Sequence, residues 1–220
     1  MKKSCFITFE GPEGSGKSTQ AALVVEHLKR RGIRVIHTRE PGGTRVAETI
    51  RNLILDPGNT IAPLTELLLY EAARAQHAAD VLLPALMKGI VVICDRYTDA
   101  TLAYQGFARG IDQSIIRRLN AIATHGLIPD LTILLDITVE KGLKTARGLN
   151  KDSFSSSGDR MEQEAVSFHR KVRSGYLTLA KKEPRRIRVI KTQATIETTQ
   201  ALVIAVTEQL LKKKKIIPGR

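Results

Sequence analysis

One nine-residue stretch constrains the fold of this 220-residue chain more than any other: Gly11, Pro12, Glu13, Gly14, Ser15, Gly16, Lys17, Ser18 and Thr19. It fits the pattern G-x-x-x-x-G-K-[ST], follows the apolar run 4–10 and precedes a helical pattern. In that setting, glycines let backbone N–H groups turn inward around an anion, and the helix dipole adds positive potential. We therefore expect a nucleoside triphosphate here, with Lys17 at its β and γ phosphates and Ser18 on Mg²⁺.

The rest of the chain alternates between strand and helix patterns, which indicates a parallel sheet covered on both faces. The expected strands are 4–10, 35–38, 90–95, 131–136 and 187–191. The expected helices are 17–31, 44–55, 63–88, 112–124, 138–146, 159–181 and 196–212. Pro84 is expected to kink or break the third helix. Residues 148–158 are rich in Ser and Gly and predict a mobile loop, and we find neither an internal repeat nor a linker between domains.

Charge and cysteine usage limit the classes of function. The chain carries 35 Lys and Arg against 22 Asp and Glu, a formal net charge of +13. This balance permits nucleic-acid binding and fits polyanionic small molecules equally well. We interpret Lys212–Lys215 as a solvated helix end or frayed tail, with an interaction arm as the alternative. No apolar run approaches the roughly 20 residues that span a bilayer, and no signal-peptide pattern is found. We interpret Cys5 and Cys94 as free buried thiols. Together these features lead us to expect a cytoplasmic protein.

Polar side chains at the ends of two expected strands mark a second ligand site. Asp95 ends the strand 90–95, Arg96 follows it, and Arg39 follows the strand 35–38. Ligands of open α/β sheets bind at this edge, and an arginine offers a forked donor for phosphate. Tyr70 and Arg74 share one helix face, where they can stack on and hydrogen-bond a base. Each feature has a structural alternative. Asp95 and Arg96 could form a structural ion pair, and the Pro-Gly-Gly after Arg39 could be a simple turn. Tyr70 and Arg74 could be a tyrosine at the edge of the core and an arginine that extends to solvent.

Seven segments spread from Phe9 to Glu164 form an ordered set: FEGPEGSGKST, TREPGGT, YEAARAQH, DRYTDATLAYQG, RGID, PDLTILLD and DRMEQE. This set resembles bacterial thymidylate kinases, which transfer the γ-phosphoryl group of ATP to dTMP. The resemblance implies a three-layer α/β/α P-loop fold of the nucleoside monophosphate kinase superfamily, with a five-stranded parallel sheet in the order 2-3-1-4-5 and a mobile lid. It implies a single kinase domain at 1–213, a lid at about 147–160 and a basic tail at 214–220.

The resemblance also implies roles for matching positions. Arg74 would hydrogen-bond the thymine edge, and Thr101 and Gln105 would read the base. Tyr104 would crowd the 2′ carbon of the sugar, and Tyr70 stands where the family usually has a stacking Phe. The set implied at dTMP is Glu10, Arg39, Pro41, Tyr70, Arg74, Asp95, Arg96, Thr101, Tyr104 and Gln105, and the ligands implied for Mg²⁺ are Ser18 and Asp95.

A cation from the lid is expected to complete the catalytic set, which is Lys17, Arg96, Arg160, Arg147 and Glu10. Some family members carry a basic residue inside the phosphate loop, and this chain has none there besides Lys17. We expect Arg160 first and Arg147 second to supply the missing charge when the lid closes. Lys151 lies in the same segment, and a solvated surface charge is the alternative for all three. Our hypothesis for Glu13 is that it receives such a basic residue on closure.

Two other functions compete with dTMP kinase. One is a kinase for another nucleoside or nucleoside monophosphate. The other is a non-catalytic or nucleic-acid-binding NTPase, which the net charge favours but which leaves the acceptor motifs unexplained. For a dTMP kinase, no histidine is needed as a base, because the acceptor phosphate is already ionised near neutral pH. The family forms homodimers, so the helices from Pro63 and Asp112 are candidate contacts, whereas nucleic acid and membrane are not expected partners.

Overall fold

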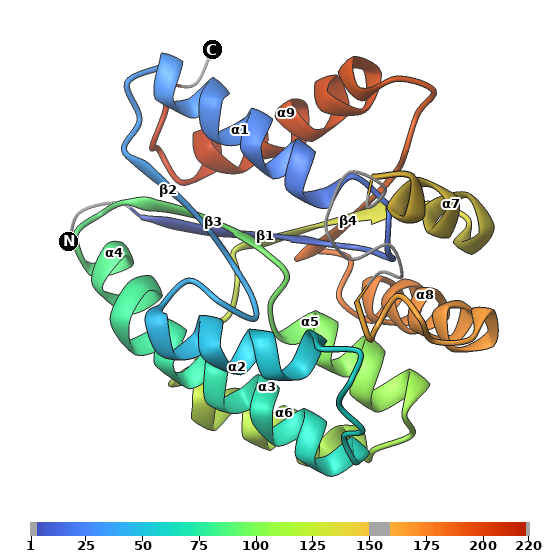
Figure 1. Cartoon of the computed structure of the whole chain (residues 1–220). Helices are drawn as coiled ribbons and strands as arrows, with labels where there is room; N and C mark the ends of the chain where they lie inside the picture. Colours follow the sequence, from blue (N-terminus) through green and yellow to red (C-terminus); the bar gives the residue numbers. More distant parts are fainter. Residues whose placement is uncertain (1–3, 150–158, 219–220) are drawn as a thin grey trace.

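A parallel sheet forms the centre of the computed structural model, which describes residues 4–149 and 159–218 (Figure 1). Its strand order, β2-β3-β1-β4-β5, confirms the expected one. The register sets Arg39 beside Asp95 and Asp95 beside Phe9, so three strands finish level at one edge of the sheet. The strands are β1 (Cys5–Glu10), β2 (Val35–Arg39), β3 (Val91–Asp95), β4 (Leu131–Asp136) and β5 (Ile187–Lys191).

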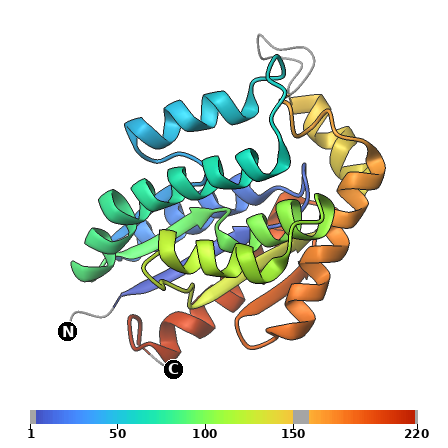
Figure 2. The same cartoon turned by 90° about the horizontal axis from the view of Figure 1, so that it is seen from below.

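Helices cover both faces of the sheet, as Figures 1 and 2 show. On one face, α1 (Lys17–Arg30) and α9 (Ile196–Lys213) pack on strand residues such as Ile7 and Ile93. On the other face, Phe6 and Leu134 pack beneath the remaining large helices. Successive strand side chains point to opposite faces, so burial on both sides explains the nearly continuous apolar strands. The second layer contains α3 (Pro63–His77), α4 (Leu83–Met87), α6 (Gln113–Ala123) and α8 (Val166–Lys182).

The expected long helix 63–88 passes Pro84 through a local change of helix type. A π-helical segment, η1 (Ala78–Leu82), joins α3 to α4. It places Pro84 in the first turn of α4, where the missing N–H removes no α-helical hydrogen bond. The proline is therefore accommodated by one wide turn.

Two other segments differ from the expectation. Residues 98–108, for which no helix was expected, form the short helix α5 (Thr98–Thr101) and the π-helical η2 (Leu102–Ala108). The helix expected from Asp159 begins at Val166 instead. The Asp159 carboxylate accepts the backbone N–H groups of Met161 and Glu162, both at 2.9 Å, which draws residues 159–164 into turns.

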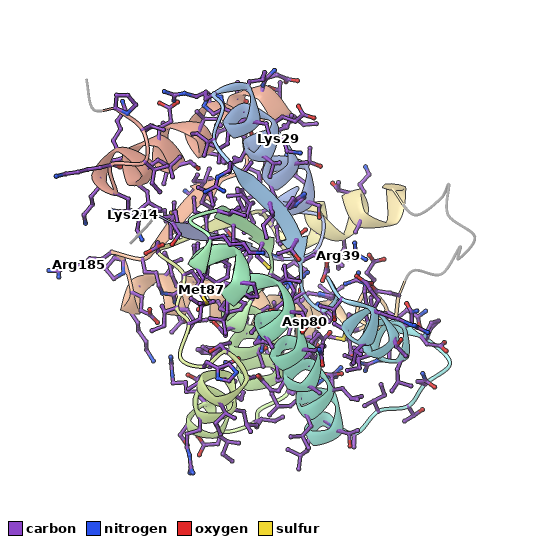
Figure 3. All side chains as sticks on the ribbon, turned by 90° about the vertical axis from the view of Figure 1, so that its left-hand side faces the viewer. Lys29, Arg39, Asp80, Met87, Arg185 and Lys214 are labelled. Atoms are coloured by element: carbon purple, nitrogen blue, oxygen red, sulfur yellow. The ribbon has the colours of Figure 1, made fainter. Side chains whose placement is uncertain are left out.

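Part of the segment expected as a basic tail from residue 214 packs against the rest of the molecule. Ile217 is 6% exposed and belongs to the core cluster that α1 and α9 form with the sheet. Lys214 forms an ion pair with Asp130. Figure 3 shows Lys214 far across the molecule from Arg39, which ends β2 at the opposite edge of the sheet. The apolar pair at 216–217 explains why residues 214–218 fold back onto the core.

Among the helices in the described segments, none is long and apolar enough to cross a membrane.

Replacing Ile217 tests this packing. Ile217→Ala removes buried methyl groups and is expected to lower the free energy of unfolding by about 2 kcal/mol. The matched control is Ile196→Ala, since Ile196 is 54% exposed on α9 and its loss should cost less than about 0.5 kcal/mol. Urea unfolding measures both, and equal small effects would mean that the segment does not belong to the core.

Candidate functional site

A cavity of about 330 Å³ opens at the edge of the sheet where β1, β2 and β3 end. Its walls come from the start of α1, from α3, and from α2 (Arg45–Leu55), α5, η2 and α7 (Val139–Leu149). The expected site residues on these walls are Glu13, Gly14, Gly16, Lys17, Ser18, Thr19, Arg39, Pro41, Tyr70, Arg74, Asp95, Arg96, Thr101, Tyr104 and Gln105. The described residues that were expected at the site but lie off these walls are Glu10, Gly11, Pro12, Ser15 and Arg160.

The glycine-rich loop packs tightly against its surroundings. Gly14 has a φ of +67°, and a Cβ there would collide with the carbonyl oxygen of Gly142 in α7. Lys17 is 6% exposed, and its ammonium group donates to the Pro12 carbonyl at 2.9 Å, so the side chain lies folded along the loop. Burial and the nearby Arg96 guanidinium lower the pKa of Lys17. A phosphate anion at this position relieves that repulsion, since it offsets both cations.

Glu13, the acid within the loop, has a partner other than the expected lid residue. Arg96 donates to its Oε1 at 2.6 Å, and the Tyr104 hydroxyl donates to the same oxygen at 2.7 Å. The guanidinium of Arg96 also lies over the Tyr104 ring, 5.0 Å from its centroid. Although burial opposes ionisation, Arg96 and Lys17 lower the pKa of Glu13 to about 2. Glu13 is therefore an ionised bridge between the phosphate loop and the end of β3.

Arg96 adopts a backbone conformation that needs support. Its φ is +67°, in the left-handed region, and its N–H donates to the Phe9 carbonyl at 2.9 Å. The next N–H, of Tyr97, donates to Oε1 of Glu10 at 2.7 Å, and the hydroxyl of Tyr176 donates to Oε2 at 2.7 Å. Glu10 is thus fully buried behind the turn that presents Arg96.

The environment of Glu10 favours its neutral form. Burial, with the charge of Asp99 nearby, raises the pKa of Glu10 to about 8. The structure thus places Glu10 below the cavity wall, as a support under Arg96.

Nearly all the hydrogen-bond donors of the Arg74 guanidinium are used by neighbouring residues. Its Nε donates to Glu40 at 2.7 Å, and its Nη1 donates to Glu71 and Asn120, both at 2.8 Å. Its Nη2 donates to the Tyr97 carbonyl at 3.1 Å. Four of the five guanidinium N–H groups are used in this way, which leaves one Nη2 N–H without a partner among the described residues. The side chain is rigid and has a single donor to offer a ligand.

The far end of the cavity combines apolar and polar groups. Tyr70 lines it from α3, and Thr101 and Gln105 line it from the segment after β3. The Thr101 hydroxyl is buried and has no hydrogen-bond partner in the part of the chain that the structure describes, which marks it as a group available to a ligand. Gln105 is 1% exposed and donates its Nε2 to Glu66 at 2.8 Å.

Among the expected lid cations, Arg160 has a described side chain, and it does not line the cavity. The Arg160 guanidinium donates to Glu66 at 2.6 Å and to the Ile54 carbonyl at 2.7 Å. The side chain of Arg147, in α7, and the whole of Lys151 lie outside the described part of the chain. In this structure Arg160 therefore joins the segment after residues 150–158 to α2 and α3, away from the phosphate loop.

The expected magnesium ligands lie together. The Ser18 hydroxyl donates to Oδ2 of Asp95, and Oδ1 of Asp95 is buried without a hydrogen-bond partner within residues 4–149 and 159–218. Mg²⁺ is commonly held by one or two protein oxygens, with substrate phosphates and water completing the shell. The donor set at this position fits that pattern.

Several residues on the cavity walls were not predicted. Arg51 reaches the wall from α2, where it donates to the Pro41 carbonyl at 3.0 Å. No local pattern identifies it, because it is one of two arginines on an amphipathic helix. Glu40 and residues 159–162 fall within the quoted motifs, which could have signalled them. The unpredicted wall residues are Glu40, Arg51, Leu55, Tyr97, Ala100, Ala146, Asp159, Met161 and Glu162.

Comparison with known proteins agrees with this arrangement. The family model described as thymidylate kinase matches residues 9–203. A thymidylate kinase of Trichlorobacter lovleyi is 48% identical over 209 residues, which cover 94% of this chain and 97% of the relative. One of Geotalea uraniireducens is 51% identical over 202 residues, covering 91% and 95%.

A solved structure gives the same result. The crystal structure of thymidylate kinase from Ehrlichia chaffeensis superposes with a TM-score of 0.76 at 35% identity, and the match covers 93% of this chain and 98% of the other. With the phosphate loop, the strand order and the composite cavity in place, the chain belongs to the thymidylate kinase family.

Proposed function

We propose that the chain phosphorylates dTMP to dTDP in this cavity, with ATP on the phosphate loop and dTMP between α3, β3 and η2. The observation that carries the proposal is the continuous wall from Lys17 through Arg96 to Gln105. This wall joins an end that can bind phosphate to an end where hydrogen-bond donors and an aromatic ring can meet a base. Residues 11–19 hold the donor phosphates through backbone N–H groups and the N-terminus of α1.

The acceptor base lies at the far end of the cavity. Tyr70 stacks on it, and the free N–H of Arg74, the Thr101 hydroxyl and the Gln105 amide meet its edge. The Arg74 donor suits a carbonyl oxygen such as O4 of thymine, because a guanidinium can only donate. A buried site of this kind rejects bases that leave its polar groups unpaired. Tyr104, fixed by Glu13, crowds the sugar.

The acceptor phosphate lies among arginines. Arg39, Arg51 and Arg96 all line the cavity, from the end of β2, from α2 and from the turn after β3. Burial and the charge of neighbouring Arg39 lower the pKa of Arg51, which indicates a cluster of cations suited to an anion. These arginines orient the acceptor oxygen in line with the γ phosphorus. No base is needed, since a phosphate monoester with a second pKa of about 6 is ionised at neutral pH.

Ser18 and Asp95 are proposed to hold Mg²⁺ that arrives with ATP. The metal supplies charge neutralisation at the transferring phosphoryl group. Lys17 adds a fixed cation on the donor side, and Arg96 adds one on the acceptor side. Glu10 contributes indirectly, because its hydrogen bond to the Tyr97 N–H holds the turn that presents Arg96.

We also propose the lid-arginine type of enzyme, since Lys17 is the only basic residue of the loop 11–19. Arg160 would have to leave Glu66 and Ile54 to reach the phosphates. We therefore assign the cation from the lid to Arg147 in preference to Arg160, and assign Arg160 to anchoring the segment that follows the lid.

A homodimer in the cytoplasm is proposed for the working enzyme. Leu64 and Leu68 are 57% and 49% exposed on one face of α3, and Ile115 and Ile122 are 47% and 71% exposed on α6. Such neighbouring apolar side chains suit contact with a second copy. Cys5 and Cys94 are both buried and unpaired, as in a reducing compartment.

An acceptor panel tests the function. With ATP and Mg²⁺, dTMP is expected to give the highest kcat/KM among dTMP, dUMP, dCMP, dGMP and thymidine, measured by coupled ADP release. Thymidine is the control without a phosphate, and it leaves the arginine cluster unfilled. Rapid turnover of a purine nucleotide with none of dTMP would indicate another kinase. ATP hydrolysis that requires DNA would indicate the nucleic-acid alternative.

The buried Glu10 predicts a pH effect on stability. Its folded pKa of about 8 lies above the value near 4.3 of an unfolded glutamate, so the folded chain keeps a proton that the unfolded chain loses. Stability from this group is therefore full at low pH and falls as pH rises towards 8, by at most about 1.4 kcal/mol per pH unit. Glu10→Gln should flatten this fall in urea unfolding between about pH 5.5 and pH 7.5. Parallel profiles for the two proteins would contradict a protonated Glu10.

A further inference from the structure

Glu66, outside the catalytic set, is the most heavily bonded carboxylate near the cavity. It is fully buried on α3, and both of its oxygens accept two hydrogen bonds. Oε1 accepts from Gln105 at 2.8 Å and from Nε of Arg109 at 3.2 Å. Oε2 accepts from Nη2 of Arg109 at 3.0 Å and from Arg160 at 2.6 Å. The carboxylate is thereby fixed in position and direction.

The two arginines keep Glu66 ionised. Burial alone would favour the neutral acid, but hydrogen bonds from Arg109, Gln105 and Arg160 lower the pKa of Glu66. Arg109 is itself held by a second acid, Glu164, at 2.5 Å, and packs over the Phe168 ring. Neither arginine can accept a hydrogen bond. An ionised carboxylate accepts only, so whichever group faces Glu66 must be a donor.

This requirement settles the orientation of the Gln105 amide. The two ends of a glutamine amide have nearly the same shape and differ in hydrogen bonding, since the nitrogen donates and the oxygen accepts. With Glu66 ionised, the nitrogen must face Glu66, and the reversed amide would set two acceptors against each other. Oε1 is then the end of the amide that points away from Glu66, and Gln105 lies on the cavity wall.

We propose that Glu66 is a positioning residue that holds Gln105 with its amide oxygen towards the cavity, and so selects a base edge that carries a hydrogen-bond donor. The inference rests on the proposed function, in which Gln105 meets the base. Thymine offers the donor N3–H, whereas a cytosine ring has a bare acceptor nitrogen at the same place. The network around Glu66 would therefore act in choosing between the two pyrimidines without touching either.

The sharpest probe is a pair of acceptors that differ only at that edge. The nucleotide 5-methyl-dCMP keeps the methyl group, sugar and phosphate of dTMP, and changes only ring positions 3 and 4. The readout is the ratio of kcat/KM for dTMP to that for 5-methyl-dCMP. A residue that is merely structural alters both values together and leaves the ratio unchanged. A residue that orients Gln105 changes the ratio.

The principal variant is Glu66→Gln, whose amide can rotate to accept from or donate to Gln105. The ratio should fall by about tenfold or more, because the Gln105 amide can then reverse. The matched control is Arg109→Gln, which disturbs the same cluster but leaves the Gln105–Glu66 bond. It should lower thermal stability and leave the ratio within about twofold of the unmodified protein.

A charge-balanced variant guards against misfolding. Glu66→Gln alone leaves two arginines near one remaining acid, whereas Glu66→Gln with Arg109→Gln removes one charge of each sign. The ratio of kcat/KM for dTMP to that for 5-methyl-dCMP should be about tenfold lower in this double variant than in Arg109→Gln. An unchanged ratio in either folded Glu66 variant would overturn the proposal.

A further variant separates failure of this proposal from failure of the proposed function. Gln105→Met removes the amide while keeping the side-chain length. If it lowers the ratio while Glu66→Gln does not, Gln105 reads the base without help from Glu66 and only the present inference fails. If the unmodified protein does not phosphorylate dTMP, the proposed function itself fails.

Discussion

The contact between Glu13 and Arg96 joins the two halves of the site. The phosphate loop is built on β1 and α1, whereas Arg96 follows β3, so the parts that meet ATP and the acceptor come from separate segments. An ionised acid in an anion-binding loop is unfavourable by itself. Here it neutralises an arginine whose backbone is held in a left-handed conformation, and it also anchors the Tyr104 hydroxyl. The geometry between donor and acceptor therefore depends on one pair of opposite charges.

Buried acids elsewhere in the site follow the same logic. Glu40 and Glu71 hold Arg74, Glu66 orients Gln105, and Glu10 supports the Arg96 turn. Each fixes a group that faces the cavity, and each is itself largely removed from water. Phosphoryl transfer requires alignment and fixed charge more than covalent chemistry, so a rigid frame of ion pairs suits the reaction. Burying such pairs adds little net stability, which favours a positioning role for them.

The sequence predicted the parts of this structure that local chemistry determines. The phosphate loop, all five strands and most of the helices follow from spacing and polarity, and many of the residues in the quoted motifs lie on the cavity walls. Long-range pairing was not predictable. Nothing near Glu13 indicates a partner 83 positions away, and nothing near Arg160 indicates Glu66. The π-helical turns were missed as well, because their hydrophobic pattern does not separate them from an α-helix or a loop.

A double-mutant cycle on Glu13 and Arg96 tests the central claim most directly. Glu13→Gln, Arg96→Gln and the double variant are compared with the unmodified chain by kcat/KM for dTMP. The bridge predicts a coupling of about 1.5 kcal/mol or more, because removing the acid alone leaves Arg96 unpaired beside Lys17. Effects that simply add, with a coupling below about 0.5 kcal/mol, would show that the two halves of the site are positioned independently.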